Sequence, residues 1–153
     1  SFANMISDVC DKLSADKNVV LTSIGSDSRI GNKYFNPGYS FGGPCFPRDT
    51  KALKQVIDSV NINRDLLGAT TKYNEEHSLF QTNQLLKEGT ETYVIEDICY
   101  KEGSKIPIIE ESAKLKIAKN LVKAGKKVII KDESHMIDEV IKEYGNLFEY
   151  QLK

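Results

Sequence analysis

With 153 residues, the chain is long enough for one ordinary domain or two small ones, and its 40% hydrophobic and 28% charged residues are typical of a soluble globular protein. Its formal net charge of -1 gives no electrostatic attraction to nucleic acid or to an anionic membrane surface, so neither is expected as a partner. No apolar run is long enough to span a bilayer, and residues 1–5 lack the basic region and apolar core of a signal peptide.

The first part of the chain is predicted to be helical around one long loop. Apolar residues recur at helical spacing over residues 2–13, and a chain that begins directly in a helix suggests a fragment. Residues 18–24 are ambiguous, because the Val-Val-Leu run at 19–21 suits a strand on propensity alone. Residues 26–46 are rich in Gly, Pro, Asn and Ser, which predicts a long loop, and long loops are often functional.

Two further helices are predicted after this loop. The first covers residues 50–60, with Asp49 as its N-cap. Its predicted apolar face consists of Leu53, Val56, Ile57 and Val60. The second runs from about Arg64 to Glu88, and Gly89 marks its end. The chain up to about residue 90 is therefore expected to be all-helical apart from the loop.

Beyond residue 90 the composition changes to an alternation of strands and helices. The predicted elements are a strand at 92–95, a helix at 113–124 between the caps Ser112 and Gly125, a strand at 127–130, a helix at 136–144 and a third strand within 147–152. Strand, helix and strand at this spacing form a βαβ unit, which predicts a parallel sheet. This block is short for a complete doubly wound domain.

Three cysteines, Cys10, Cys45 and Cys99, lie far apart in the sequence. An odd number at wide spacing is a poor disulfide framework and indicates a reducing compartment, so we expect a cytoplasmic protein. No pair has Cys-x-x-Cys spacing, and His77 and His135 are isolated, so no metal site is predicted. Cys10 and Cys99 lie in apolar patterns and are interpreted as packing residues, and His77 as a partly buried helix residue.

The most informative stretch is residues 37–49, Pro-Gly-Tyr-Ser-Phe-Gly-Gly-Pro-Cys-Phe-Pro-Arg-Asp. Its glycines let a ligand approach the backbone closely, and Cys45 lies just before a helix N-terminus, where partial positive charge stabilises a thiolate. Arg48 adds a cation, and Asp49 offers a carboxylate to position water or accept a proton. These groups suit covalent catalysis. On the residues alone, a turn with a buried cysteine is the simpler interpretation.

The order and spacing of residues 27–31 (Asp-Ser-Arg-Ile-Gly), 37–38 (Pro-Gly) and 41–50 (Phe-Gly-Gly-Pro-Cys-Phe-Pro-Arg-Asp-Thr) closely resemble the signature of the UDP-glucose/GDP-mannose dehydrogenase family. Looser matches to the same family are at Phe2–Leu13, Asn74–Glu75, Tyr100–Lys101 and Glu111–Ser112. The resemblance implies a mixed fold class. An all-α central dimerisation domain, residues 1–90, would precede a partial Rossmann-like α/β UDP-binding domain, residues 91–153.

The resemblance also implies a reaction, the oxidation of UDP-glucose to UDP-glucuronate with two NAD. Cys45 attacks the C6 aldehyde to form a thiohemiacetal, hydride transfer to NAD gives a thioester, and water hydrolyses it. Asp49 would activate that water or handle protons. Arg48 stands where the family usually has a cofactor-binding lysine. UDP-glucose is favoured because Pro44 precedes Cys45, whereas the N-acetyl-mannosamine branch tends to have His there; GDP-mannose is the other candidate.

The substrate-binding residues implied by the resemblance lie in both parts of the chain. Arg29 would reach the sugar nucleotide bound to the partner subunit of a homodimer that forms through the central helices. The sugar-binding loop would include Tyr34, Phe35, Phe41 and Gly42. Lys101 would contact the substrate from the α/β part.

Two departures from the family pattern leave other interpretations open. The sequence has no Gly-x-Gly-x-x-Gly, so NAD would be bound mainly by a domain absent from this chain, which is then expected to be inactive alone. Glu110 replaces an arginine, and its carboxylate would repel NAD phosphates, which favours a non-catalytic remnant or dimerisation module. A small thiol hydrolase would need a histidine partner, and neither His77 nor His135 is placed to supply one.

Overall fold

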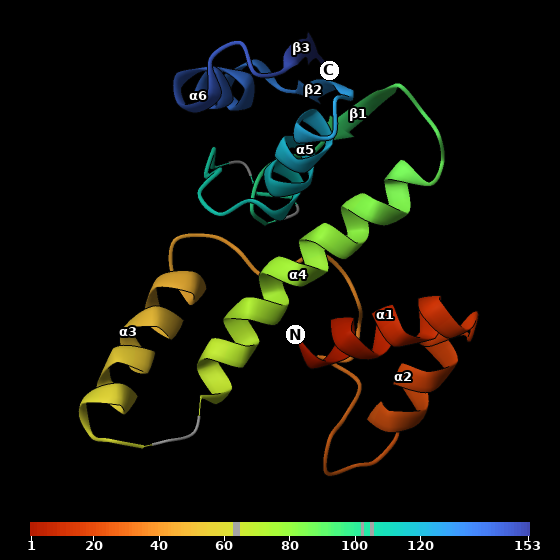
Figure 1. Cartoon of the computed structure of the whole chain (residues 1–153), viewed down its shortest axis with the longest axis vertical. Coiled ribbons are helices and arrows are strands. Elements are labelled where there is room, and N and C mark those ends of the chain that lie inside the picture. Colours follow the sequence, from red (N-terminus) through yellow and green to blue (C-terminus); the bar gives the residue numbers. More distant parts are fainter. Residues whose placement is uncertain (63–64, 102, 105) are drawn as a thin grey trace.

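The computed structural model describes residues 1–62, 65–101, 103–104 and 106–153. These described residues form six helices and three strands, in the order α1 (Phe2–Leu13), α2 (Lys17–Gly25), α3 (Phe46–Ser59), α4 (Leu66–Leu86), β1 (Thr92–Glu96), α5 (Ala113–Lys123), β2 (Lys127–Asp132), α6 (Ser134–Tyr144) and β3 (Glu149–Leu152). Helices α1–α4 form one part of the molecule, and the strands with α5 and α6 form the other (Figure 1). The predicted fold class, an all-α region followed by a partial Rossmann-like α/β region, is confirmed.

The ambiguous segment after α1 is a helix, because its N-terminus is well capped. Asp16 Oδ1 accepts hydrogen bonds from the backbone N–H of Asn18 at 2.8 Å and of Val19 at 3.1 Å. A cap of this kind contributes about 1 kcal/mol, which exceeds the modest β preference of two valines. Leu21 then packs inward and is 1% exposed.

Helix α3 begins earlier than predicted, and this corrects the role given to Asp49. The helix begins at Phe46 with Cys45 in the N-cap position and a proline in its first turn, where a missing N–H costs nothing. Asp49 lies in the first turn and is not the N-cap, and its N–H donates to Cys45 O at 2.8 Å. The predicted apolar face is also not buried, since Leu53 and Val56 are 51% and 56% exposed.

Helix α4 connects the two parts of the molecule. Its predicted start at Arg64 lies outside the described residues, and it begins at Leu66 after Asp65, whose Oδ1 accepts from Gly68 N at 2.7 Å. Along its length it packs against α1 and α3 and then, near its C-terminus, against α5 (Figure 1). Residue 90 falls in the connection between α4 and β1, and the division of the chain into two domains there stays a prediction.

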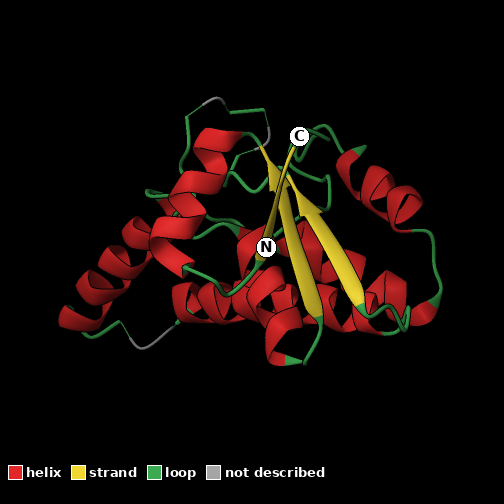
Figure 2. Ribbon diagram, turned by 90° about the horizontal axis from the view of Figure 1, so that it is seen from above, coloured by secondary structure: helices red, strands yellow, loops and turns green. Residues whose placement is uncertain are grey.

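The sheet has the order β1-β2-β3 with both pairs parallel, as the βαβ pattern predicts. Val94 pairs with Ile129, and Ile129 with Glu149. The strands lie side by side with helices flanking the sheet (Figure 2). The main buried apolar cluster lies in this part of the chain and includes Ile98, Ala118, Leu121, Ile130 and Val140, each 0% exposed. Within the described residues, no helix is both long and apolar enough to cross a membrane.

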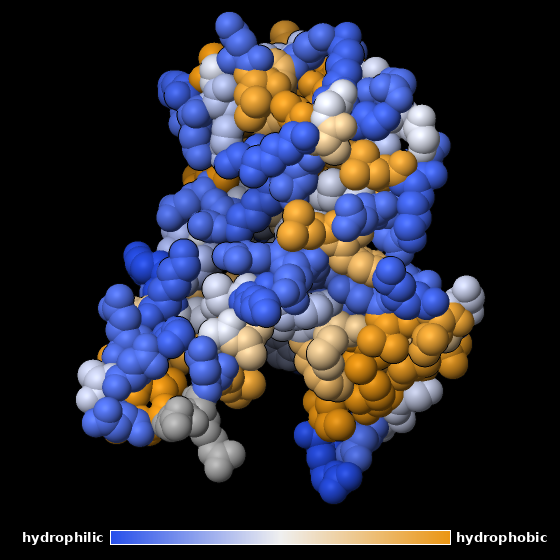
Figure 3. Space-filling view, viewed as in Figure 1, coloured by the Kyte–Doolittle hydropathy of each residue, from blue (hydrophilic) through white to orange (hydrophobic). Residues whose placement is uncertain are grey.

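The helical part leaves apolar side chains on its surface. Helix α1 forms as predicted, but it buries Ala3, Asn4, Ser7 and Cys10. Its apolar stripe is exposed by 41–73% and consists of Phe2, Met5, Val9 and Leu13. Apolar atoms accordingly gather over α1 and α2 in the lower right of Figure 3. A group of exposed apolar side chains on one helix face is typical of an interaction surface.

Candidate functional site

The Cys45 loop, residues 26–45, ends with an exposed thiol at the N-terminus of α3. The aligned peptide dipoles of α3 place partial positive charge at this end of the helix, where it stabilises an anion. Cys10 is buried and Cys99 is half-buried, with its Sγ 3.4 Å from Ile106 O and 3.3 Å from Ile108 O. Of the three thiols, that of Cys45 is therefore the accessible one, as its predicted role requires.

Arg48 and Asp49 form an ion pair beside this thiol. Arg48 Nε donates to Asp49 Oδ1 at 3.0 Å, and the two side chains are 70% and 64% exposed. That hydrogen bond, and then the charges of Asp49, Cys45 and Glu110, raise the pKa of the Arg48 guanidinium. Because Asp49 follows Cys45 by about one helical turn, both side chains belong to the same face of α3.

The two glycines before Cys45 pack against the segment that precedes α5. Gly43 has φ +81° and donates its N–H to Glu110 O at 3.1 Å. A Cβ atom would lie 2.0 Å from Glu111 O if added to Gly42 and 2.3 Å from the Tyr100 ring if added to Gly43. The predicted site residue Gly42 thus permits a close backbone approach between the helical part and the α/β part.

Side chains of α1 and α4 supply the hydrogen bonds of the loop backbone between Gly38 and Phe41. Asn4 accepts from Gly38 N at 2.9 Å and donates to Tyr39 O at 3.1 Å. Asn74 pairs with both the N–H and the carbonyl of Phe41, at 2.8 Å each. Ser40 Oγ donates to Asn74 O at 2.6 Å. The loop therefore follows a defined path although it has no regular secondary structure.

Sequence reasoning missed most of this polar network. Asn74 was identified only through the resemblance. Asn4 and Ser78, whose Oγ lies 2.8 Å from Ser40 Oγ, were not identified. These residues are buried, with 8% and 2% exposure. In the sequence they are only an asparagine and a serine within helical stretches, and polar residues at such positions usually face solvent.

The structure distributes the predicted substrate residues over separate places. Tyr34, Phe35 and Phe41 line a cavity of about 440 Å³ beside the N-terminus of α1, where the Phe35 ring lies 5.9 Å edge-on from that of Phe2. Tyr34 is 92% exposed. Among the described residues, Cys45 is not part of that lining.

The two predicted substrate-binding cations lie apart from that cavity. Lys101 lines another cavity, of about 250 Å³, at the carboxyl ends of β1 and β2, the edge where open α/β sheets bind ligands. Arg29 is 87% exposed, and its Nη2 donates to Asp27 at 2.7 Å. This hydrogen bond raises the pKa of Arg29. The chain alone thus does not bring Arg29 or Lys101 to the thiol.

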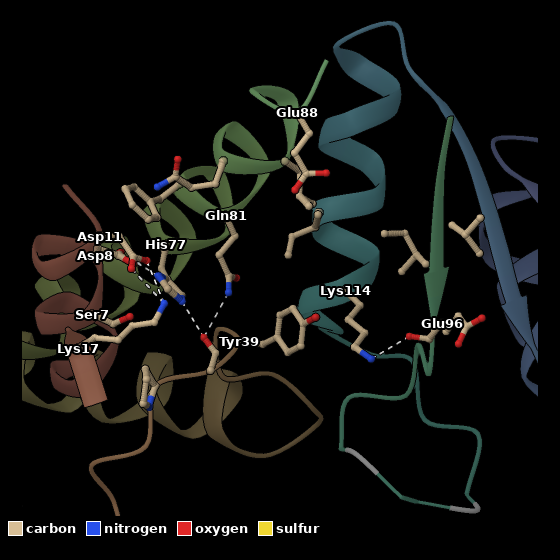
Figure 4. A pocket seen from close by; sticks show the side chains of 18 residues that line it. Ser7, Asp8, Asp11, Lys17, Tyr39, His77, Gln81, Glu88, Glu96 and Lys114 are labelled. Carbon is tan, nitrogen blue, oxygen red and sulfur yellow. Dashed lines mark hydrogen bonds and ion pairs between the residues drawn. The ribbon is translucent and has the colours of Figure 1, made fainter. Parts of the chain in front are cut away.

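A cavity of about 660 Å³ that was not predicted lies between α1, α4 and the α/β part (Figure 4). On one side Asp8 and His77 are hydrogen-bonded to each other. On the other, Lys114 Nζ donates to Glu96 O at 2.8 Å and lies 5.4 Å from the centre of the Tyr39 ring. Gly38 and Tyr39 of the Cys45 loop form part of its wall.

Comparison with known proteins agrees with the motif and with the fold. Residues 1–76 match the UDP-glucose/GDP-mannose dehydrogenase family, central domain. UDP-glucose 6-dehydrogenase TuaD of Bacillus subtilis is 40% identical over 86 residues, which are 56% of this chain and 19% of that protein. The UDP-glucose 6-dehydrogenase of Rickettsia bellii is 32% identical over 130 residues, 82% of this chain and 30% of that protein.

Two solved structures extend the likeness across the whole chain. A UDP-glucose dehydrogenase from Pyrobaculum islandicum superposes with a TM-score of 0.81 at 25% identity, covering 97% of this chain and 35% of that one. A GDP-mannose dehydrogenase from Pseudomonas aeruginosa shares the fold, with a TM-score of 0.66 at 23% identity over 98% of this chain and 37% of that one. The chain thus spans between 19% and 37% of these four relatives, and it belongs to the UDP-glucose/GDP-mannose dehydrogenase family.

Proposed function

We propose that this chain supplies the nucleophilic cysteine, and part of the sugar-nucleotide site, of an enzyme that oxidises UDP-glucose to UDP-glucuronate in the cytoplasm. The observation that carries the proposal is the exposed thiol of Cys45 at the N-terminus of α3, within the motif that identifies the family. Because the chain spans so little of its relatives, we expect these residues to have no activity by themselves.

In this reaction NAD, when bound, accepts the hydride of each oxidation step. The residues of this chain do not fit a complete NAD site, since no Gly-x-Gly-x-x-Gly occurs in the 153 residues. Arg48, the predicted cofactor contact, already forms an ion pair with Asp49, and the negative charge of Glu110 contributes to its raised pKa. We therefore propose that NAD is bound mainly by residues outside these 153.

The chemistry assigned to this chain takes place at Cys45 Sγ. The thiolate attacks the C6 aldehyde carbon, a C–S bond forms, and the former carbonyl oxygen takes up a proton, which gives a thiohemiacetal. After loss of a hydride from C6 and of the hydroxyl proton, the product is a thioester. Water then adds to the thioester carbon, the C–S bond breaks, and the thiolate leaves the acid. The helix dipole stabilises the thiolate both as nucleophile and as leaving group.

Asp49 is the group that we propose acts on the water of the last step. Its side chain is exposed, belongs to the same face of α3 as that of Cys45, and is held by Arg48. A carboxylate within reach of the attacking water accepts its proton as the C–O bond forms. Arg48 is then an orienting partner of Asp49 in addition to any contact with the cofactor.

The proposed substrate site is completed by a second subunit. The guanidinium of Arg29 is directed to solvent, and the exposed stripe of Phe2, Met5 and Val9 on α1 provides an apolar surface for a homodimer through the central helices. Tyr34, Phe35, Phe41 and Gly42 would hold the sugar of one subunit. Lys101 would contact the nucleotide at the carboxyl edge of the sheet.

Calorimetric titration of the complete enzyme that carries this chain tests the substrate assignment. UDP-glucose should bind at least about tenfold more tightly than GDP-mannose, a difference of about 1.4 kcal/mol. UDP-glucose addition should also reduce NAD. Tighter binding of GDP-mannose would transfer the assignment to that substrate.

A second candidate, a non-catalytic assembly module of the same family, is favoured by Glu110. Its backbone carbonyl accepts from Gly43 N, and its carboxylate, where the family pattern has an arginine, contributes negative charge at Arg48. This candidate predicts sugar-nucleotide binding or dimerisation without NAD reduction. Turnover by the complete enzyme would exclude it.

A further inference from the structure

His77 lies buried between two oxygen atoms that belong to different elements. The residue is on α4 and 3% exposed. Its Nδ1 is 2.8 Å from Asp8 Oδ2 on α1, and its Nε2 is 2.8 Å from the carbonyl oxygen of Gly38 in the Cys45 loop (Figure 4). It therefore connects α1, α4 and the loop at a single point.

Both of these oxygens act as hydrogen-bond acceptors. A backbone carbonyl has no hydrogen to donate. Asp8 Oδ2 also accepts from the hydroxyl of Tyr73, at 2.5 Å. Burial, and then the hydrogen bond to Asp8, raise the pKa of Tyr73, so its hydroxyl keeps its hydrogen and donates it. As a carboxylate, Asp8 has no hydrogen to donate to the His77 ring.

Two acceptors require two donors, and only the imidazolium form of histidine has a hydrogen on each ring nitrogen. A neutral ring would leave one nitrogen lone pair facing an oxygen at 2.8 Å, which is repulsive. Losing the second hydrogen therefore removes a bond either to α1 or to the loop. This consequence follows from the geometry and depends on protonation.

We propose that His77 is a positioning residue that fixes the Cys45 loop through Gly38, and that it does so only while its ring carries both hydrogens. Loss of one hydrogen loosens the loop upstream of Cys45. The meaning of this switch for catalysis rests on the proposed function, whereas the switch itself does not.

The other hydrogen bonds of this loop segment do not titrate. Asn4 and Asn74 are neutral amides, and Gln81 Nε2 is a weaker donor to Gly38 O at 3.3 Å. The Gly43 bond to Glu110 joins two backbone groups. The pH dependence of the segment between Gly38 and Phe41 is therefore assigned to His77.

The charged and titratable groups around His77 come from five elements. They are Asp8 and Asp11 of α1, Lys17 of α2, Tyr73, Glu76 and Glu88 of α4, and, across the cavity, Glu96 of β1 with Lys114 at the start of α5. Lys17 is paired with Asp11 at 3.1 Å, and Lys114 is turned to Glu96 O and the Tyr39 ring. In the part of the chain that the structure describes, Asp8 is thus the charged group that contacts the ring.

Nuclear magnetic resonance of the 153-residue chain tests the proposal directly, because the sequence has only two histidines. His135 on α6, with a 42% exposed side chain, is an internal control. The ring nitrogens of both are followed between about pH 5 and 9, together with the Tyr39 amide, which shares a peptide bond with the Gly38 carbonyl. The chemical shift of the Tyr39 amide should change over the pH range in which His77 loses its hydrogen, and not over the range in which His135 does. Exchange of the Phe41 amide, corrected for its intrinsic pH dependence, should accelerate about fivefold to tenfold over the same step.

A glutamine at position 77 separates positioning from protonation. His77→Gln retains one amide donor for Gly38 and has no hydrogen to lose, so the Tyr39 amide should no longer follow pH, while His135→Gln leaves that response intact. A Tyr39 shift that stays constant while His77 loses its hydrogen, or that still follows pH in His77→Gln, overturns the proposal. If the variant does not fold, the test rests on the wild-type chain, where the pH midpoint of the Tyr39 amide is compared with those of the two histidine rings. None of these readouts uses substrate, so failure here is distinct from failure of the proposed reaction.

Discussion

The helical part and the α/β part of the molecule bury opposite kinds of side chain. In the α/β part, Ile98, Leu121 and Ile130 are fully buried, and the sheet with α5 and α6 encloses a continuous apolar cluster. In the helical part, Ala3, Cys10 and Leu21 are buried, but most other buried positions hold hydrogen-bonded polar residues such as Asn4, Ser40, Asn74, His77 and Ser78. Large apolar side chains on α1 and α3, such as Leu13, Leu53 and Val56, remain at the surface.

This difference indicates different purposes for the two parts. An apolar cluster stabilises a fold without regard to the exact path of a loop. A buried polar network specifies one arrangement, because every unsatisfied group costs about 1–3 kcal/mol. The helical part therefore fixes the loop that precedes Cys45, and its exposed apolar faces are the surfaces we propose to be covered by a second subunit.

The largest expected effect concerns the apolar cluster. Leu121→Ala should lower the free energy of unfolding by about 2–5 kcal/mol, because it removes a fully buried side chain and leaves a cavity. Leu53→Ala on the exposed face of α3 is the matched control and should change it by less than about 0.5 kcal/mol in the monomer. Urea unfolding followed by circular dichroism measures both. Equal losses would show that α3 is covered in solution.

The next largest effect is expected where the two parts meet. Gly43→Ala should cost about 2–3 kcal/mol, because φ +81° is unfavourable for alanine and the added methyl group meets the Tyr100 ring. Combining it with Tyr100→Ala should recover part of the loss, measured as a coupling free energy in a double-mutant cycle. Strict additivity of the two changes would mean that the ring and the glycine do not constrain each other.

Asn74→Ala tests the polar network itself. The change leaves the N–H and the carbonyl of Phe41 without their partner and should lower the free energy of unfolding by about 1–3 kcal/mol. Asn18→Ala, at an exposed position on α2, is the control and should have little effect. Hydrogen exchange at Phe41 should accelerate in the first variant and remain unchanged in the second. Unchanged hydrogen exchange of the Phe41 amide in Asn74→Ala would show that Asn74 does not fix the loop.

The smallest expected effect is a pH-dependent one at the segment before α5. The pKa of Glu111 is lowered, first by the hydrogen bond from Lys116, so its contribution is complete above its ordinary pKa of 4.5 and is lost as pH falls below that value. Glu111→Gln should therefore remove about 0.5 kcal/mol of stability at neutral pH and none in strong acid. Urea unfolding at a series of pH values would contradict this if the difference grew as the pH fell.

Sequence patterns predicted the secondary-structure elements that depend on periodicity. They failed where individual hydrogen bonds or a proline determine how a helix begins. The stripe of α1, the βαβ order and the long loop before α3 follow from repeating apolar positions and from loop composition, and the structure confirms them. Helix α2 was left ambiguous because Val19 and Val20 prefer strands, and the Asp16 cap that decides the matter acts through two hydrogen bonds. The Asp49 cap was wrong because Pro47 already belongs to the first turn.

The site was predictable only in part. The Cys45 motif is contiguous in sequence, so a linear pattern can reveal it, and the exposure of the thiol fits it. The groups that hold the loop, such as Asn4, Asp8 and His77, lie more than thirty residues from the backbone atoms or side chains they contact. In the sequence, such polar residues cannot be distinguished from those of a solvent-exposed helix face, because only the tertiary fold places the loop against them. The roles given to Arg29, Lys101 and the aromatic residues stay predictions.

The proposed role of Cys45 as the nucleophile is decided by the turnover of a serine variant. In the complete enzyme, Cys45→Ser should lower UDP-glucuronate formation by about a thousandfold or more. Cys99→Ser, whose hydroxyl can keep the bonds to the carbonyl groups of Ile106 and Ile108, should retain turnover within about threefold. Undiminished acid formation in Cys45→Ser would exclude Cys45 as the nucleophile, because no thioester could then form at this position.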